Sequence, residues 1–250
     1  MTTATKPAKD PAFRWRGGEI TRLEGFSDAV FAFAITLLIV SLEVPHTFND
    51  LLIAMHGFFA FAICFALLIS IWYQQYIFFR RYGLQDGWTI TLNSALLFVV
   101  LFYIYPLKFL FGLLVEQLSG GMPTVRDATG HMVPMIEPRQ GPELLLIYAA
   151  GYIAVSLLLA LMFWHAWQKR HELELNRVEQ FDTAASIIEA LVGVLVGTVS
   201  VALVLSGLSR FAGWCYPVLL TTLMTWQGTW AGRRRHRIAE YIAPGGIESQ

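Results

Sequence analysis

Ionisable side chains within or beside long apolar segments are the first residues in this sequence that could do chemistry. They are Asp28, Glu43, Lys108, Glu116 and Glu189. Because a charge in hydrocarbon is costly, each of them is a functional candidate. The four carboxylates lie near segment ends, however, and Lys108 can extend its ammonium group outward along its alkyl chain. A proton relay needs carboxylates at mid-depth, and this arrangement does not supply them.

Signatures of other chemistry are absent from the sequence. It contains no glycine-rich phosphate loop, no GxSxG elbow and no HExxH pattern, so it predicts no enzyme. Cys64 and Cys215 form no CxxC or Cys/His cluster, and the six histidines are scattered, so we expect neither a cofactor nor a resident metal. The net charge is zero. This disfavours a nucleic-acid partner, since such proteins concentrate Lys and Arg on one face.

The first apolar segment carries an apolar stripe interrupted by one threonine. With 100° per residue, the members of a stripe about 100° wide are Phe26, Ala29, Phe33, Thr36, Leu37, Val40 and Val44. Ser27 and Asp28 lie off this stripe, where neighbouring helices can satisfy their polar groups. Periodicity alone favours a surface that faces lipid or a partner helix.

The elements that must position these residues are spanning helices. Of the 250 residues, 56% are hydrophobic and 14% charged, with a mean hydropathy of +0.53, whereas soluble chains are about a quarter charged. Crossing a bilayer takes about 20 apolar residues. Six segments qualify: 26–44, 51–79, 88–115, 142–167, 186–208 and 211–231. The sequence therefore predicts an all-α integral membrane protein with six transmembrane helices.

Basic residues predict the orientation, because short cytoplasmic segments hold the excess of Lys and Arg. The side opposite to this excess holds only Arg126, Arg139 and Arg210. We therefore expect a multi-pass protein of the cell inner membrane with both termini in the cytoplasm. Residues 1–25 form the cytoplasmic N-terminal segment, 26–231 the transmembrane domain and 232–250 the cytoplasmic tail. The stretch 117–141, rich in Gly and Pro, is expected to be a solvated outer loop.

Three strings carry a resemblance to a known family. Residues 22–40 read RLEGFSDAVFAFAITLLIV and contain the pattern RxxxFSD, while SIWYQQYIFF covers 70–79 and NSALLFVVLFYIYP covers 93–106. Together they resemble the transmembrane-protein-175 family of potassium channels. The likeness is strong over about residues 20–110 and faint beyond them.

The resemblance implies an unconventional tetrameric cation channel in which each of four chains contributes its first helix to the pore. A TVGYG filter is absent, as in the family. Carried over, the pore-lining and constriction residues are Phe33, Thr36, Leu37 and Val40. The motif network comprises Arg22, Phe26, Ser27, Asp28 and Asn93. Potassium is the expected permeant ion, transient in the passage, and the expected partners are further copies of the chain and membrane lipid.

Two departures and two alternatives remain open. Phe33 stands where many relatives have a branched aliphatic residue, which leaves the position of the narrowest ring open. Gln74, Gln75 and Tyr76 stand where many relatives have histidines, so a pH response through those histidines is not expected. The chain could instead be a proton-leak or proton-coupled cation transporter, or a membrane scaffold that conducts nothing.

Overall fold

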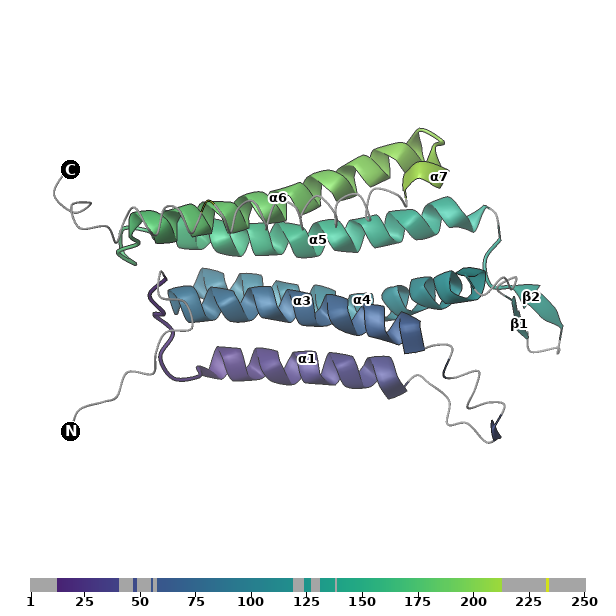
Figure 1. Cartoon of the computed structure of the whole chain (residues 1–250), viewed down its shortest axis with the longest axis horizontal. Helices are drawn as coiled ribbons and strands as arrows, with labels where there is room; N and C mark the ends of the chain where they lie inside the picture. Colours follow the sequence, from purple (N-terminus) through teal and green to yellow (C-terminus); the bar gives the residue numbers. More distant parts are fainter. Residues whose placement is uncertain are drawn as a thin grey trace.

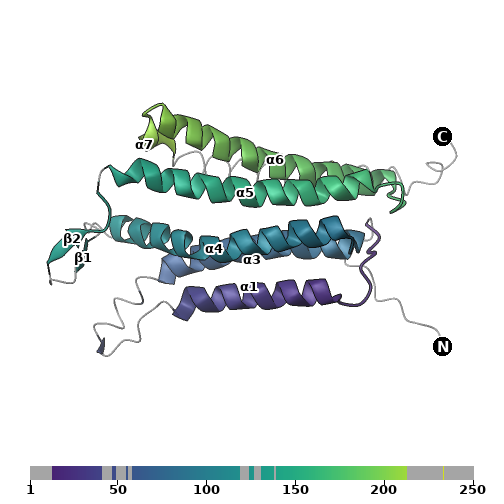
Figure 2. The ribbon, with the colours of Figure 1, turned by 180° about the vertical axis from the view of Figure 1, so that it is seen from behind.

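The computed structural model of the chain describes residues 13–40, 47–48, 55, 58–118, 124–126, 131–137, 139–212 and 233. Long helices lie lengthwise beside one another (Figures 1 and 2): α1 (Arg22–Val40), α3 (Phe58–Tyr82), α4 (Gly87–Leu118), α5 (Gln140–Gln168) and α6 (Arg177–Leu205). The short helix α7 (Ser209–Ala212) follows α6. Strands β1 (Thr124–Arg126) and β2 (Met132–Pro134) form an antiparallel hairpin at the end of the bundle opposite to the start of α1.

The helices pack in a sequence of layers that leaves α1 at one side and α6 at the other. α1 packs on α3 and α4, α5 packs on α4 and α3, and α6 packs on α5. Aromatic side chains fill the core between α3 and α5, where the ring centres of Phe78 and Phe163 lie 5.6 Å apart. The starts of α1, α4 and α6 and the ends of α3 and α5 therefore gather at one end of the bundle (Figure 1).

Four of the described helices are long and apolar enough to cross a membrane. They cover Phe61–Tyr82, Gly87–Phe109, Gln140–Gln168 and Arg177–Leu205. This confirms a predominantly helical, multi-pass membrane protein. The first predicted span overlaps α1, and the sixth, 211–231, lies outside the described residues beyond Ala212. The number of six spans therefore stays a prediction.

Helix starts are where the structure departs most from the predicted spans. α1 begins at Arg22 because Thr21 and Glu24 form reciprocal contacts, with the Glu24 amide donating to Thr21 Oγ1 at 3.1 Å and the Thr21 amide to Glu24 Oε1 at 3.3 Å. α6 begins at Arg177 instead of at 186, because Asn176 and Glu179 form a capping box. Hydropathy misses these starts, since the first turns of both helices are polar.

The stretch 117–141, predicted to be a solvated outer loop, contains secondary structure that the prediction does not include. Within it, Val125 pairs with Val133 at the centre of the β1–β2 hairpin. Strands of three residues have too short an alternation for a periodicity analysis to detect them.

Candidate functional site

Helix α1 has two opposite faces, one buried in the chain and one exposed. The buried side chains recur every three or four residues, as expected for one helix face, and are Glu24, Ser27, Phe31, Ala34 and Leu38. They contact α3 and α4, the helices on which α1 packs. The exposed residues on the other side include Phe26, Ala29, Phe33 and Thr36. The described part of the predicted stripe from Phe26 to Thr36 thus lies on the face of α1 that its own chain leaves uncovered.

A buried polar relay fixes the inner face of α1 against α3 and α4. Asn93 of α4 donates through Nδ2 to Ser27 Oγ at 2.9 Å, and Ser27 donates in turn to the backbone oxygen of Leu23 at 2.8 Å. Gln75 of α3 donates through Nε2 to Asn93 Oδ1. Ser27, Gln75 and Asn93 are all almost fully buried. Since each amide and hydroxyl here finds a partner, the relay sets one register between the three helices.

Asp28 extends this contact between α1 and α3 at the edge of the relay. Trp72 donates through its indole Nε1 to Asp28 Oδ1 at 2.8 Å, and its ring stacks on Tyr76 at 5.5 Å. Asp28 is therefore bound by a donor on a neighbouring helix, as its position off the stripe predicts. Asp28 is nevertheless exposed in the single chain, although it lies off the stripe. The carboxylate lies at the rim of the packed surface.

The remaining predicted site residues lie apart from this relay. Arg22 and Phe26 are exposed at the start of α1. Thr36 is exposed, and its hydroxyl donates to the backbone oxygen of Ala32 at 2.9 Å. Leu37 is half-buried, and Val40 is the last residue of α1, with a side chain outside the described part. The structure thus brings Ser27, Asp28 and Asn93 into one region and leaves Phe26, Phe33 and Thr36 exposed on the other face of α1.

Sequence reasoning missed the part played by Trp72 and Gln75. Gln75 was singled out only as a replacement for a histidine, yet it is buried and donates to Asn93. A signal for it existed: a polar residue three positions from Trp72 within an apolar helix shares its face with that tryptophan. Glutamine keeps a hydrogen bond at this place and carries no titrating proton.

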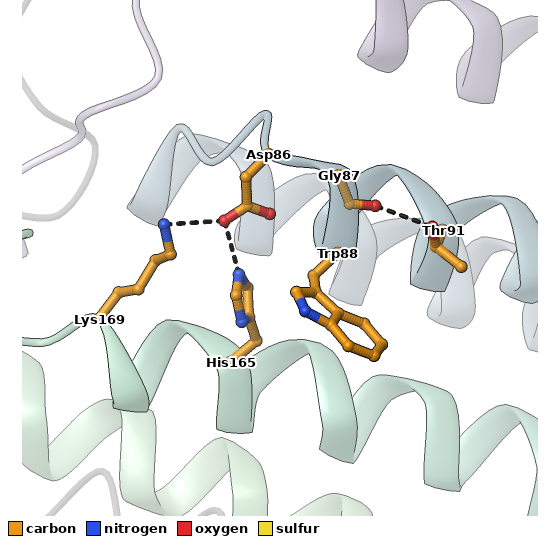
Figure 3. Close-up of a pocket in the computed structure, with 6 residues that line it drawn as sticks. All are labelled: Asp86, Gly87, Trp88, Thr91, His165 and Lys169. Carbon is orange, nitrogen blue, oxygen red and sulfur yellow. Dashed lines mark hydrogen bonds and ion pairs between the residues drawn. The ribbon is translucent and has the colours of Figure 1, made fainter.

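A second polar cluster joins the start of α4 to the end of α5. Asp86 caps α4, since the Thr89 amide donates to Asp86 Oδ1 at 2.9 Å. Figure 3 shows Lys169 and His165 both directed at this carboxylate, with Lys169 Nζ at 2.9 Å and His165 Nε2 at 2.7 Å from Asp86 Oδ2. Trp88 and Thr91 complete the lining of the shallow hollow beside it. The sequence offers His165 only as one of six scattered histidines and does not single it out.

The electrostatics of this cluster favour the ionised carboxylate. Burial of Asp86 opposes its ionisation, but hydrogen bonds from Thr89, Lys169 and His165 outweigh burial and hold the pKa of Asp86 well below its usual range. The bond to Asp86 in turn raises the pKa of Lys169. Asp86 therefore holds α4 and α5 together as a charged group. Among the residues that the structure describes, no three His, Cys, Asp or Glu side chains are placed to hold a metal ion.

Comparisons with known proteins place this arrangement in a family. The family model described as "Endosomal/lysosomal potassium channel TMEM175" matches residues 22–103, which include α1, α3 and the first half of α4. A potassium channel of Marivirga tractuosa is 48% identical over 183 residues, which are 73% of this chain and 73% of that protein. A potassium channel of Chamaesiphon minutus is 28% identical over 156 residues, 59% of this chain and 66% of that one.

A solved structure is similar over nearly its whole length. It is the crystal structure of a variant of the potassium channel MtTMEM175 in complex with a nanobody fusion protein. Its TM-score is 0.75 with 39% sequence identity, and the match covers 89% of this chain and 98% of that one. The likeness therefore extends past the region of the family model into α5 and α6.

Proposed function

Because this chain belongs to the TMEM175 family of potassium channels, we propose that it is a homotetrameric potassium-permeable channel whose passage is lined by the exposed face of α1 from each of four copies. The family and the matched relatives are channels and not enzymes, in agreement with the sequence. Phe33, Thr36, Leu37 and, by its sequence position, Val40 line this passage. Potassium ions cross it without a bound cofactor.

The observation that carries this proposal is the division of α1 into two faces. The polar relay through Ser27 and Asn93 turns the inner face toward α3 and α4. Phe33, 57% exposed, and Thr36 then project away from their own chain. The family match begins at the first residue of α1. A face that merely contacted lipid would be equally exposed, so the experiment below separates the two cases.

The side chains on this face suggest how ions would be selected. Rings of Phe33 and Leu37 around an axis would be too apolar to keep a narrow passage wetted, so an ion must lose water to cross it. Potassium is less strongly hydrated than sodium and pays less for this loss. The Thr36 hydroxyl directs its hydrogen to the oxygen of Ala32, which leaves its oxygen lone pairs available to a dehydrated cation.

We place the chain in the cell inner membrane with both termini in the cytoplasm, and the charge distribution supports this orientation. Described basic residues gather where α1, α4 and α6 begin and α3 and α5 end, and are Arg14, Arg16, Arg22, Arg80, Arg81, Lys169, Arg170 and Arg177. Arg126 and Arg139 lie toward the opposite end, with the β hairpin and the start of α5. The richer end is the cytoplasmic one by the positive-inside rule.

The test compares potassium and sodium flux through purified variants in liposomes. Phe33→Ala and Leu37→Ala should widen the passage and admit water. Lowering the barrier by about 1.4 kcal/mol would raise flux about tenfold, with weaker discrimination between the two ions. Unchanged flux and selectivity in both variants would refute the α1 passage. The scaffold alternative would then stand if the parent conducts nothing, and the transporter alternative if flux follows the proton gradient.

The controls have to be exposed residues of the same types. Leu38, one position beyond Leu37 and off the stripe, is unsuitable as a control because it is 2% exposed. Its truncation would leave a cavity and cost about 2 to 5 kcal/mol. Phe102→Ala on α4 and Leu195→Ala on α6 remove exposed side chains instead. Both should conduct as the parent does at matched tetramer content.

A further inference from the structure

The segment that precedes α1 is held tightly against the end of the helix bundle. Residues 13–21, here called the N-terminal clasp, run from the start of α1 across the end of α3 toward the start of α6 (Figure 1, purple). Phe13 is 1% exposed, with the Arg81 guanidinium 4.7 Å from its ring centre and the Tyr82 ring at 5.8 Å. A polar segment at a helix start would ordinarily be solvated, so these contacts call for an explanation.

The first anchor of the clasp is an ion pair between Arg16 and Glu179 of α6. Arg16 Nη2 lies 2.7 Å from Glu179 Oε2 and Nη1 lies 3.1 Å from Oε1, a two-pronged contact. The Glu179 side chain is 1% exposed and also accepts from the backbone amides of Arg14 and Asn176. Arg16 Nε donates to the Leu173 oxygen at 2.8 Å. Both charged groups are therefore surrounded by partners, and the Glu179 carboxylate is almost fully buried while Arg16 keeps only a small exposed part.

The second anchor binds the clasp to the end of α3. The Gly17 amide donates to the Arg80 oxygen at 3.1 Å, and Arg80 Nη1 donates to the Gly18 oxygen at 3.0 Å. A Cβ on Gly17 would lie 2.7 Å from the Phe79 oxygen, so only glycine permits this approach. Arg80 Nη2 also pairs with Glu24, the capping residue of α1, at 2.8 Å. The start of α1 is thus tied to α3 on the same surface.

These two anchors connect helices that otherwise pack on different neighbours. α1 packs on α3 and α4, whereas α6 packs on α5. The clasp crosses from one group to the other and joins the first turn of α1 to the first turn of α6 through Glu24, Arg80, Arg16 and Glu179. Any tilt or axial shift of α1 at this end has to break buried charge contacts or carry α6 along.

We propose that Arg16 and Glu179 are positioning residues for the channel: the N-terminal clasp holds the start of α1 and thereby favours the conformation in which the α1 rings close the passage. The proposal rests on the function above in that α1 lines the passage. Releasing the clasp removes contacts made in this conformation, and so shifts the population toward conformations in which α1 is displaced. The clasp itself touches no permeating ion.

The test records single channels and potassium flux from the purified full-length protein. Arg16→Ala and Glu179→Gln should raise the fraction of time open about tenfold, while the conductance of each opening and the preference for potassium over sodium stay as in the parent. Arg16→Lys keeps the charge but loses the two-pronged contact, so its open fraction should lie between those of the parent and Arg16→Ala. Arg14→Ala is the matched control, because its side chain and its partner Glu174 are both exposed.

A second readout reports on the clasp without conduction. Hydrogen exchange of the peptide spanning residues 13–21 should accelerate in Arg16→Ala and Glu179→Gln. Once the ion pair is lost, the clasp separates more often from the bundle, and the Arg14 and Gly17 amides leave their acceptors on Glu179 and Arg80. Faster exchange with an unchanged open fraction would overturn the proposal, and so would a changed conductance or ion preference per opening. Loss of the tetramer even in Arg16→Lys would overturn it too, by assigning the clasp to assembly. Failure of the α1 passage itself would appear separately, in the Phe33 and Leu37 variants.

Discussion

At the scale of single residues, Asp86 combines two tasks that substitution can separate. It caps α4 through the Thr89 amide and pairs with Lys169 and His165 of the α5 end. Asparagine is about as good a helix cap as aspartate but carries no charge. Asp86→Asn should therefore keep the cap and lose the ion pair, while Asp86→Ala should lose both. We expect a cost of about 1 kcal/mol or less for the partly exposed pair, and about 1 kcal/mol more for the cap.

The contribution of the Asp86 carboxylate to the stability of the folded chain should decrease in acid. The folded pKa of Asp86 is lowered from an unfolded value near 4. Its stabilising contribution is consequently complete above about pH 4 and is lost as the pH falls through the folded pKa. Thermal unfolding in detergent from pH 7 to pH 3 should show the gap between parent and Asp86→Asn narrowing in acid. A gap that widens in acid would contradict this account of the carboxylate.

Single residues also show what the sequence could and could not predict about the candidate site. The resemblance to the family pointed to Ser27, Asp28 and Asn93, and the structure places them near one another. Gln75 and His165 became informative only once α3, α4 and α5 were packed together. Two residues on different helices have no fixed spacing in the sequence, so no pattern within one helix could have paired His165 with Asp86.

At the scale of elements, α6 approaches α5 through two glycines. Gly193 and Gly197 lie four residues apart on the buried side of α6. A Cβ on Gly197 would lie 2.4 Å from Ile153 Cγ1, and one on Gly193 would lie 2.7 Å from Ser156 Oγ. Small residues at this spacing let two membrane helices come close enough for extensive van der Waals contact. The α5–α6 pair is the best candidate for a rigid body within the subunit.

Substitution at Gly197 tests this close approach. Gly197→Leu should force α5 and α6 apart and destabilise the chain by about 1 to 3 kcal/mol, the usual cost of overpacking. Ala202→Leu, at an exposed position of the same helix, also introduces a leucine side chain and should change little. The two variants would be compared by their thermal unfolding temperatures and by their monodispersity in detergent. Equal stability of both variants would mean that the helices can separate freely.

The length of the apolar segments predicts that these helices exist, but it does not predict where they begin. Apolar length located the cores of α1, α3, α4, α5 and α6, because twenty apolar residues have few alternatives to a spanning helix. The same criterion placed the start of the fifth span at 186, whereas α6 begins at Arg177. Asn176 and Glu179 carry the pattern that marks this start, a capping residue three positions before an acid. This capping pattern can be seen in the sequence, but a hydropathy window averages over several residues and does not detect it.

At the scale of the whole molecule, the two ends of the bundle differ in charge. The proposed orientation places the α5–α6 turn inside the cell and the β1–β2 hairpin outside. In a background with Cys64 and Cys215 replaced by alanine, His131→Cys should react in intact cells with a thiol reagent that cannot cross membranes. Glu172→Cys should react only after permeabilisation. Both positions are exposed, so accessibility within the protein does not bias the result. The reverse pattern would invert the orientation.

The N-terminal clasp also has a consequence for the order in which the protein is made. Arg16 and Glu179 lie 163 positions apart. The charge of Arg16 therefore cannot be paired with Glu179 until the start of α6 has been synthesised. At about 5 to 20 residues per second, a ribosome needs about ten to thirty seconds to synthesise the chain between them. During that interval Arg16 is without its final partner on α6. The clasp can therefore form only after the start of α6 has been synthesised, so the start of α1 is fixed to α6 late in the making of the chain.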